Sequence, residues 1–194
     1  MNRDLRQTRS LQSELKTRTE PSDNEKIIEG YFIVFNRETE LWPGAFEEIA
    51  PEALDKTLSN DIRALINHDT TLVLGRNKAG TLSLTKDDRG LWGSVKVNEK
   101  DADAMNLYER VKRGDVDQCS FGFNITGEET DWRDDGTVKW RITEIDLHEV
   151  SVCTFPAYEE TGVQARQSEV TQHKQRQIEQ RKNTLKGRLH KLWH

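Results

Sequence analysis

The sequence predicts a mixed, mainly β protein, built as a small barrel or sandwich with one or two helices. Between residues 26 and 158, short runs of alternating apolar residues recur and are separated by turn signals, which is the pattern of short half-buried strands. Only residues 101–113 have the spacing of a clear amphipathic helix. Hydrophobic residues make up 34% of the 194-residue chain and charged residues 32%, so we expect part of the chain to lie outside the core.

The first half of the predicted domain contains three β runs and one short helix. Residues 27–35 are rich in β-branched and aromatic side chains, with Gly30 as a bulge or close approach. Residues 42–46 form a turn followed by a short apolar segment, and Pro51 opens a predicted helix over 51–58. Residues 61–68 form the next predicted strand, which ends at His68.

The second half continues the same pattern. Short strands are expected at residues 72–76, 80–85 and 91–97. The helix at 101–113 has Asp101 as its cap, a buried face of Ala104, Leu107, Tyr108 and Val111, and Gly114 as its stop. Further strands are predicted at 117–125, 137–145 and 147–155, and Pro156 ends the last of them.

The chain is expected to have three parts. Residues 1–24 are polar and predict a disordered or cleavable leader, residues 25–166 form the folded domain, and residues 167–194 form a basic, Gln-rich tail that is helical or disordered. Residues 164–194 carry eight Lys and Arg against two Glu, a charge of +6, whereas the other 163 residues carry 21 against 32, a charge of -11. The composition therefore predicts an acidic body with a basic tail.

Several classes of protein are disfavoured by composition. No apolar run is long enough to span a bilayer, and residues 1–24 lack the apolar core of a secretion signal. Cys119 and Cys153 lie in apolar, strand-like runs and are expected to be reduced core thiols in the cytoplasm. Two cysteines at this separation do not make a zinc site, so we expect no metal and no cofactor.

Ser120 is the first candidate for chemistry. In the predicted strand 117–125, alternation places Cys119 and the apolar residues that follow it on one face, and Ser120 on the other with Gly122 and Asn124. A small polar shelf around a hydroxyl is open to a substrate. A serine nucleophile needs a histidine that accepts its proton and a third group that holds the histidine.

His68 and Glu149 are the expected partners of Ser120. The domain contains only two histidines, His68 and His148, and His68 is placed at a predicted strand end where an imidazole can reach substrate. In the last strand, alternation places Glu149 on the small polar face, so it is the preferred orienting acid. His148 remains an alternative third member, and Asp69, adjacent to His68, is expected to point away from it. Backbone amides of residues 154–158 or the side chain of Arg166 are candidate oxyanion donors.

A set of ordered motifs resembles the prohead protease family of tailed bacteriophages. They are Ala64-Leu-Ile-Asn-His-Asp69, Val73-Leu-Gly-Arg76, Gly80-Thr-Leu82, Gly90-Leu91, Arg113-Gly-Asp115, Cys119-Ser-Phe-Gly-Phe123 and Leu147-His-Glu-Val-Ser-Val-Cys-Thr-Phe-Pro-Ala-Tyr158. The resemblance implies a serine endopeptidase on a small assemblin-like β-barrel with a few surrounding helices, as in the related herpesvirus enzymes. It also implies the order histidine, serine, third residue, which His68, Ser120 and Glu149 follow; a second histidine in the herpesvirus relatives keeps His148 open.

The resemblance also implies a place of action. Members process the major capsid protein, the scaffold segment and themselves inside the assembling prohead, in the host cytoplasm and away from membranes. A homodimer is implied by the assemblin likeness, and binding of the basic tail to nucleic acid is left open. Two alternatives remain: a catalytically inactive scaffold or assembly protein on the same fold, and a thiol peptidase that uses Cys119 with His68.

Overall fold

The computed structural model describes residues 6–12, 15–19, 25–155 and 160–192. The chain divides into two compact units: one lies within residues 3–159, and the other contains helix α2, Glu160–Leu192. All of the predicted strands lie in the first unit. No helix in the described part of the chain is long and apolar enough to cross a membrane.

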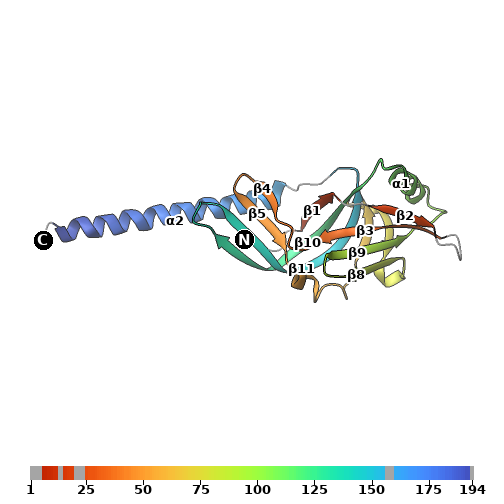
Figure 1. Ribbon diagram of the computed structural model, residues 1–194, viewed down its shortest axis with the longest axis horizontal. Helices are drawn as coiled ribbons and strands as arrows, with labels where there is room; N and C mark the ends of the chain where they lie inside the picture. The colour runs from red at the N-terminus through yellow and green to blue at the C-terminus, as the bar shows by residue number, and fades with distance from the viewer. Residues whose placement is uncertain (1–5, 13–14, 20–24, 156–159, 193–194) are drawn as a thin grey trace. The chain divides into compact units, whose positions relative to one another are not determined.

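The described strands of the first unit form two sheets (Figure 1). The larger sheet has seven strands: β1 (Gln7–Gln12), β4 (Thr39–Trp42), β5 (Ala45–Ile49), β6 (Arg63–Ile66), β7 (Asp69–Arg76), β10 (Gln118–Trp132) and β11 (Val138–Cys153). The smaller sheet has four: β2 (Lys16–Thr19), β3 (Lys26–Val34), β8 (Leu82–Lys86) and β9 (Gly90–Lys96). The mainly β mixed class is confirmed. The predicted assemblin-like barrel is not, because pairing among the described strands gives two separate sheets.

Strand β11 is the centre of the larger sheet. It pairs antiparallel with β10 over nearly its whole length, and parallel with β5 at one end and with β6 at the other. The sequence predicts a strand at 137–145 that leads directly into one at 147–155, and the structure joins them in one continuous strand. Its neighbour explains the continuity, because pairing with β10 continues through Asp146 and Leu147.

The hydrophobic core is shared by both sheets and helix α1 (Ala102–Arg113). The cluster includes Phe32 of β3, Leu91 of β9, Phe123 of β10 and Val150 of β11, all fully buried. Helix α1 confirms its prediction in detail. The Asp101 side chain accepts hydrogen bonds from the amides of residues 103 and 104, Gly114 ends the helix at φ 81°, and the buried face is the predicted one.

Two predicted elements differ from the structure. The helix expected at 51–58 is a single 3₁₀ turn, Pro51–Leu54; the proline starts the turn, but no side-chain cap supports longer growth. A second short 3₁₀ turn, Asn77–Ala79, follows β7. The stretch 1–24, expected to be a disordered or cleavable leader, contains β1 and β2 in its described part. Backbone pairing with β10 and β3 orders these polar residues without an apolar face of their own.

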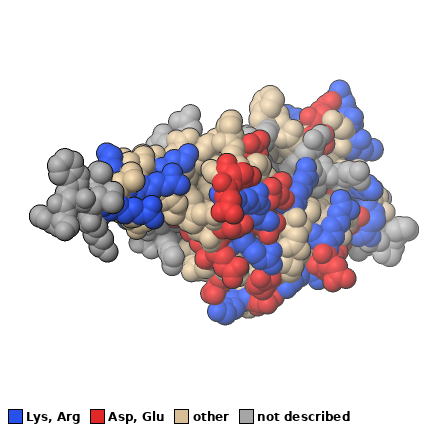
Figure 2. All heavy atoms as spheres, turned by 60° about the vertical axis from the view of Figure 1, so that its left-hand side comes forward, with Lys and Arg blue, Asp and Glu red and all other residues tan. Residues whose placement is uncertain are grey.

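Charged side chains cover the surface of the first unit without separating by sign. Figure 2 shows acidic and basic side chains interspersed over the visible face. Several of them form ion pairs; for example, Arg76 Nε lies 2.7 Å from Asp61 Oδ1. The negative charge of the body is therefore distributed on this face and does not form one acidic patch.

Candidate active site

His68 lies in a two-residue turn between β6 and β7. Ile66 pairs with Asp69, so the loop contains only Asn67 and His68, whose φ angles are 50° and 61°. Positive φ at both central residues is what a type I′ hairpin turn requires, and Asn and His tolerate this region better than most residues. The sequence analysis places His68 at the end of a strand; the structure places it in the turn just beyond the strand end.

The turn is held by hydrogen bonds to β11 and the segment after it. Asn67 donates its amide to the carbonyl of Val152 at 3.0 Å, and its side-chain oxygen accepts the amide of Thr154 at 2.9 Å. The His68 amide donates to Ser151 Oγ at 3.3 Å. These contacts fix the backbone from which the imidazole projects, and so they set the direction of its ring.

The imidazole of His68 contacts the carboxylate of Glu149. His68 Nδ1 and Glu149 Oε1 are 2.6 Å apart, and the side chains are 16% and 3% exposed. An ionised carboxylate can only accept, so Nδ1 carries the proton and the lone pair lies on Nε2. Nε2 is buried and has no hydrogen-bond partner among the described residues. This tautomer leaves a base available at Nε2.

Glu149 is held by two further donors. Ser151 Oγ donates to Oε2 at 2.6 Å, and an Arg6 nitrogen donates to Oε1 at 2.6 Å. Burial by itself would raise the pKa of the Glu149 carboxyl. The hydrogen bond and charge of His68, together with the bonds from Ser151 and Arg6, outweigh burial, so its pKa is lowered. The group is therefore an anion at neutral pH.

Ser120 lies on the same face of the sheet as this pair. Its Cα partner across the β10–β11 ladder is Ser151, and the next pair but one is Gly122 with Glu149. Directly opposed residues in an antiparallel ladder project to one face with Cβ atoms about 4.5–5.5 Å apart. The Ser120 hydroxyl is thus beside the Ser151 side chain, which contacts both Glu149 and the His68 backbone.

The hydroxyl of Ser120 is bonded to a different strand. Ser120 is fully buried, and its Oγ donates to the backbone carbonyl of Arg9 in β1 at 2.9 Å. Strand β1 pairs antiparallel with β10, and Ser10 is the Cα partner of Ser120. The structure therefore brings His68 and Glu149 into contact and sets Ser120 near them. The Ser120 hydroxyl, however, donates its hydrogen bond to the carbonyl of Arg9 and not to His68.

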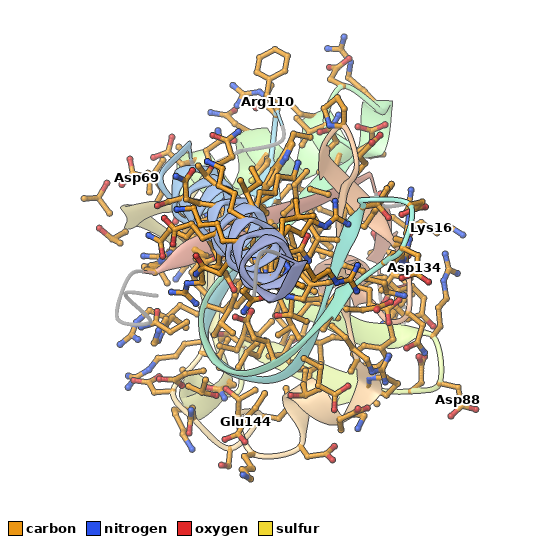
Figure 3. All side chains as sticks on the ribbon, turned by 90° about the vertical axis from the view of Figure 1, so that its left-hand side faces the viewer. Lys16, Asp69, Asp88, Arg110, Asp134 and Glu144 are labelled. Atoms are coloured by element: carbon orange, nitrogen blue, oxygen red, sulfur yellow. The ribbon has the colours of Figure 1, made fainter. Side chains whose placement is uncertain are left out.

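The other candidates of the sequence analysis lie elsewhere. His148 lies at the register shift of the β10–β11 ladder, is 40% exposed, and has its Nε2 3.1 Å from Asn124 Oδ1. Asp69 is exposed and accepts two hydrogen bonds from Thr71, and Figure 3 shows its labelled side chain at the outside of the molecule. Arg166 lies in α2, which belongs to the other unit, so its predicted oxyanion role stays a prediction. Of the predicted amides, that of Thr154 is bonded to Asn67, and residues 156–158 lie outside the described residues.

Neither cysteine is exposed at the site. Cys119 is fully buried in the hydrophobic cluster, on the face of β10 opposite Ser120. Burial, with a contribution from the Glu149 charge, raises the pKa of Cys153 to about 12, so its thiolate is scarce at neutral pH. Among the described residues, no group of three or more His, Cys, Asp or Glu side chains is placed to hold a metal ion.

Sequence reasoning missed three residues that shape the site. Ser151 and Gly122 both had a usable signal, because alternation places them on the face of Glu149 and Ser120. A Cβ atom on Gly122 would overlap Glu149 Oε1, so glycine here leaves the space that the carboxylate fills. Arg6 had no signal, since its contact with Glu149 depends on the pairing of β1, which sequence patterns do not reveal.

A family model described as caudovirus prohead serine protease matches residues 13–176. A curated relative, the prohead protease of Enterobacteria phage HK97, is 30% identical over 147 residues, which is 73% of this chain and 60% of that relative. The chain thus aligns with less than two thirds of the length of the relative. No solved structure matches the chain significantly.

Proposed function

Because the chain belongs to the caudovirus prohead serine protease family, we propose that it is a serine endopeptidase of capsid maturation. Its substrates are the major capsid protein and the scaffold segment of the precursor shell, and it also processes itself. It acts inside the assembling prohead in the host cell. The relative is named a prohead protease, and the proposal extends that activity to this chain.

The proposed mechanism assigns one role to each of three residues. Ser120 Oγ attacks the carbonyl carbon of the scissile peptide, and His68 Nε2 accepts the hydroxyl proton. The same nitrogen then gives the proton to the leaving amine. Glu149 accepts Nδ1–H, which holds the imidazole in the tautomer that leaves Nε2 free, and it stabilises the imidazolium that forms.

The observation that supports this mechanism best is the His68–Glu149 contact beside Ser120. The buried carboxylate is ionised, is 2.6 Å from Nδ1, and is fixed by Ser151 and Arg6. His68 Nε2 is buried without a partner among the described residues, and the Ser120 hydroxyl, once turned away from the Arg9 carbonyl, is our proposed donor to it. His148 is bonded to Asn124 instead, with its Nε2 3.1 Å from Asn124 Oδ1.

Turnover requires a rearrangement at Ser120. In the present arrangement its proton points to the carbonyl of Arg9, and a rotation about χ1 redirects the hydroxyl.

The test is processing by Ser120→Ala in the full chain. The parent and the variant are each co-expressed with the capsid protein and scaffold segment, and the masses of all products are measured. Ser83→Ala, which removes an exposed strand hydroxyl in the other sheet, is the matched control. We expect trimmed capsid protein with the parent and with Ser83→Ala, and uncut protein with Ser120→Ala. Trimming by Ser120→Ala would contradict the assignment, and shell assembly without trimming by the parent would favour a scaffold role.

A further inference from the structure

Strand β1 lies where an extended substrate would bind. It pairs antiparallel with β10, with Thr8 opposite Gly122 and Ser10 opposite Ser120, and Figure 1 shows it at this edge of the sheet. Adding a strand to a sheet edge is a common way to bind an extended peptide: the backbone supplies hydrogen bonds, and alternate side chains enter pockets. Any peptide presented to Ser120 along this edge of β10 must replace β1 or be β1.

The contact between the two strands is chemically specific. Ser120 Oγ donates to the carbonyl oxygen of Arg9 at 2.9 Å, so the hydroxyl is directed at the peptide group that joins Arg9 to Ser10. Ser120 and the first residues of β1 are all buried. The peptide group next to the proposed nucleophile is therefore identified without moving any strand.

The side chain before that peptide bond occupies a built subsite. The Arg9 guanidinium bonds both oxygens of Glu47, at 2.5 and 3.0 Å, and its central carbon is 5.7 Å from the centre of the Phe123 ring. The Arg9 side chain is 11% exposed and that of Glu47 is 4% exposed. The subsite lies beside a cavity lined by Ile33 and Phe121 as well as by the ion pair.

The chemistry of this subsite selects a cation. A buried carboxylate is stable only when a positive or hydrogen-bonding group faces it, and an apolar side chain in place of Arg9 would leave Glu47 desolvated without that bond. Two parallel N–H···O bonds fit a guanidinium, and the aromatic face of Phe123 adds attraction for either basic side chain. A lysine retains the charge and one of the bonds.

We propose that β1 is an intramolecular substrate and that Glu47 is the specificity-determining residue for a basic side chain just before the cut bond. This inference rests on the proposed function and adds to it a substrate class, which is extended segments with Arg or Lys at the position that Arg9 occupies. The bond of this chain presented to Ser120 is Arg9–Ser10.

The reaction balances with the groups present and one water molecule. Ser120 Oγ bonds to the carbonyl carbon of Arg9 while its proton moves to His68. The C–N bond to Ser10 then breaks as His68 returns that proton to the nitrogen. Water hydrolyses the Arg9 ester, which restores Ser120. The segment that ends at Arg9 then leaves. Because this segment includes Thr8, which lies opposite Gly122, its departure uncovers that part of the edge of β10 for other substrates.

The first experiment measures self-processing of the full chain. The amount of chain beginning at Ser10 is followed by N-terminal sequencing and intact mass for the parent, Arg9→Lys, Arg9→Leu and Glu47→Gln. We expect the Ser10 terminus in the parent and in Arg9→Lys. We expect about a 10- to 100-fold slower appearance in Arg9→Leu and Glu47→Gln, which corresponds to the loss of one charged hydrogen-bonded pair. Glu48→Gln, next to Glu47 but bonded to Lys139 and Arg141, is the matched control and keeps the parent rate.

The second experiment measures specificity on the capsid protein, and it does not depend on whether an Arg9 variant folds. The residue before each bond cut by the parent is identified by mass spectrometry. We expect Lys or Arg at these positions, and a lower share of basic residues with Glu47→Gln than with Glu48→Gln. This readout separates a subsite from a structural ion pair, because a destabilised fold lowers all cuts equally.

The outcomes distinguish the two proposals. If the parent trims the capsid protein through Ser120 but forms no Ser10 terminus, or if the Arg9→Leu variant forms that terminus as fast as the parent, the inference on β1 and Glu47 is overturned and the proposed function stands. Capsid cuts that follow non-basic residues in the parent overturn the specificity in the same way. If Ser120→Ala processes both proteins at the parent rate, the proposed function itself is refuted.

Discussion

Replacing Gly122 by alanine should displace the carboxylate of Glu149 without substituting any of the three residues that have a proposed role. A Cβ built at Gly122 overlaps Glu149 Oε1 and lies 2.7 and 2.8 Å from two nitrogens of Arg6. Both are closer than real Cβ contacts. Oε1 is the oxygen that also bonds His68 Nδ1 at 2.6 Å. The carboxylate must therefore move, and its bonds to His68 and Arg6 lengthen or break.

The size of the effect follows from the bonds at risk. A hydrogen bond to a charged group contributes about 1.5–3 kcal/mol, so loss of the His68–Glu149 bond alone corresponds to about a 10- to 150-fold fall in the rate of processing. The loss falls on kcat, because the carboxylate stabilises an imidazolium that forms only in the transition state. Binding of the capsid protein should change less, since Glu149 is 3% exposed and lies beneath the edge where substrate pairs.

Gly127→Ala is the matched control on the same strand. Its added Cβ would meet the Cβ of Glu144 at 3.0 Å, so it too crowds a neighbour across the β10–β11 ladder, but away from Glu149. The assay is the initial rate of capsid-protein trimming, with the midpoint of thermal unfolding measured on the same samples. Equal trimming by Gly122→Ala and Gly127→Ala, at similar thermal midpoints, would refute the orienting role of Glu149.

Three further predictions follow from the same contacts. Glu149→Gln should slow trimming far more than His148→Gln, and the reverse order would transfer the orienting role to His148. The pKa of Glu149 is lower in the folded chain than its unfolded value of about 4.3, so the ionised carboxylate stabilises the fold above that pH. This stabilisation is lost as the pH falls through the lower pKa of the folded state. The difference in thermal midpoint between the parent and Glu149→Gln should therefore shrink below about pH 4 and not at neutral pH. Asn67→Gly should keep the hairpin but lose the bond to the Thr154 amide. Asn67→Val should lower the free energy of unfolding in urea by about 1–3 kcal/mol more than Asn67→Gly does, because a β-branched residue resists a φ of 50°. Equal stabilities of the two variants would show that the turn is not constrained as described.

Alternation was sufficient to predict much of the site. The period of two in residues 117–125 and 147–155 places Ser120 and Glu149 on polar faces, and the structure aligns those faces across one ladder, with Ser120 opposite Ser151. Helix α1 followed from its cap, its spacing and its terminal glycine because all three are local signals. Local physics fixes these features, so they are readable without knowing what packs against them.

The remaining features depend on partners distant in sequence. No local pattern predicts that β1 pairs with β10, since residues 7–12 are polar and their strand is stabilised by the hydrogen bonds of the ladder. The turn at Asn67 and His68 carries no glycine, the usual signal of a type I′ turn, so the local pattern predicts a strand that continues through His68. The two sheets share one core through contacts between β3 and β10, which sequence alternation cannot separate from a closed barrel.

Arg6 connects the geometry of the catalytic pair with the presence of β1. Its guanidinium and His68 Nδ1 both bond Glu149 Oε1 at 2.6 Å, so one carboxylate oxygen serves two donors. A guanidinium at that oxygen satisfies the carboxylate but opposes the positive charge that His68 must acquire in the transition state. In the proposed self-cleavage the segment carrying Arg6 is removed, while the bonds of Glu149 to His68 and Ser151 involve no residue of that segment. The proposed cut after Arg9 would therefore both uncover Ser120 and remove a cation that shares Glu149 Oε1 with His68.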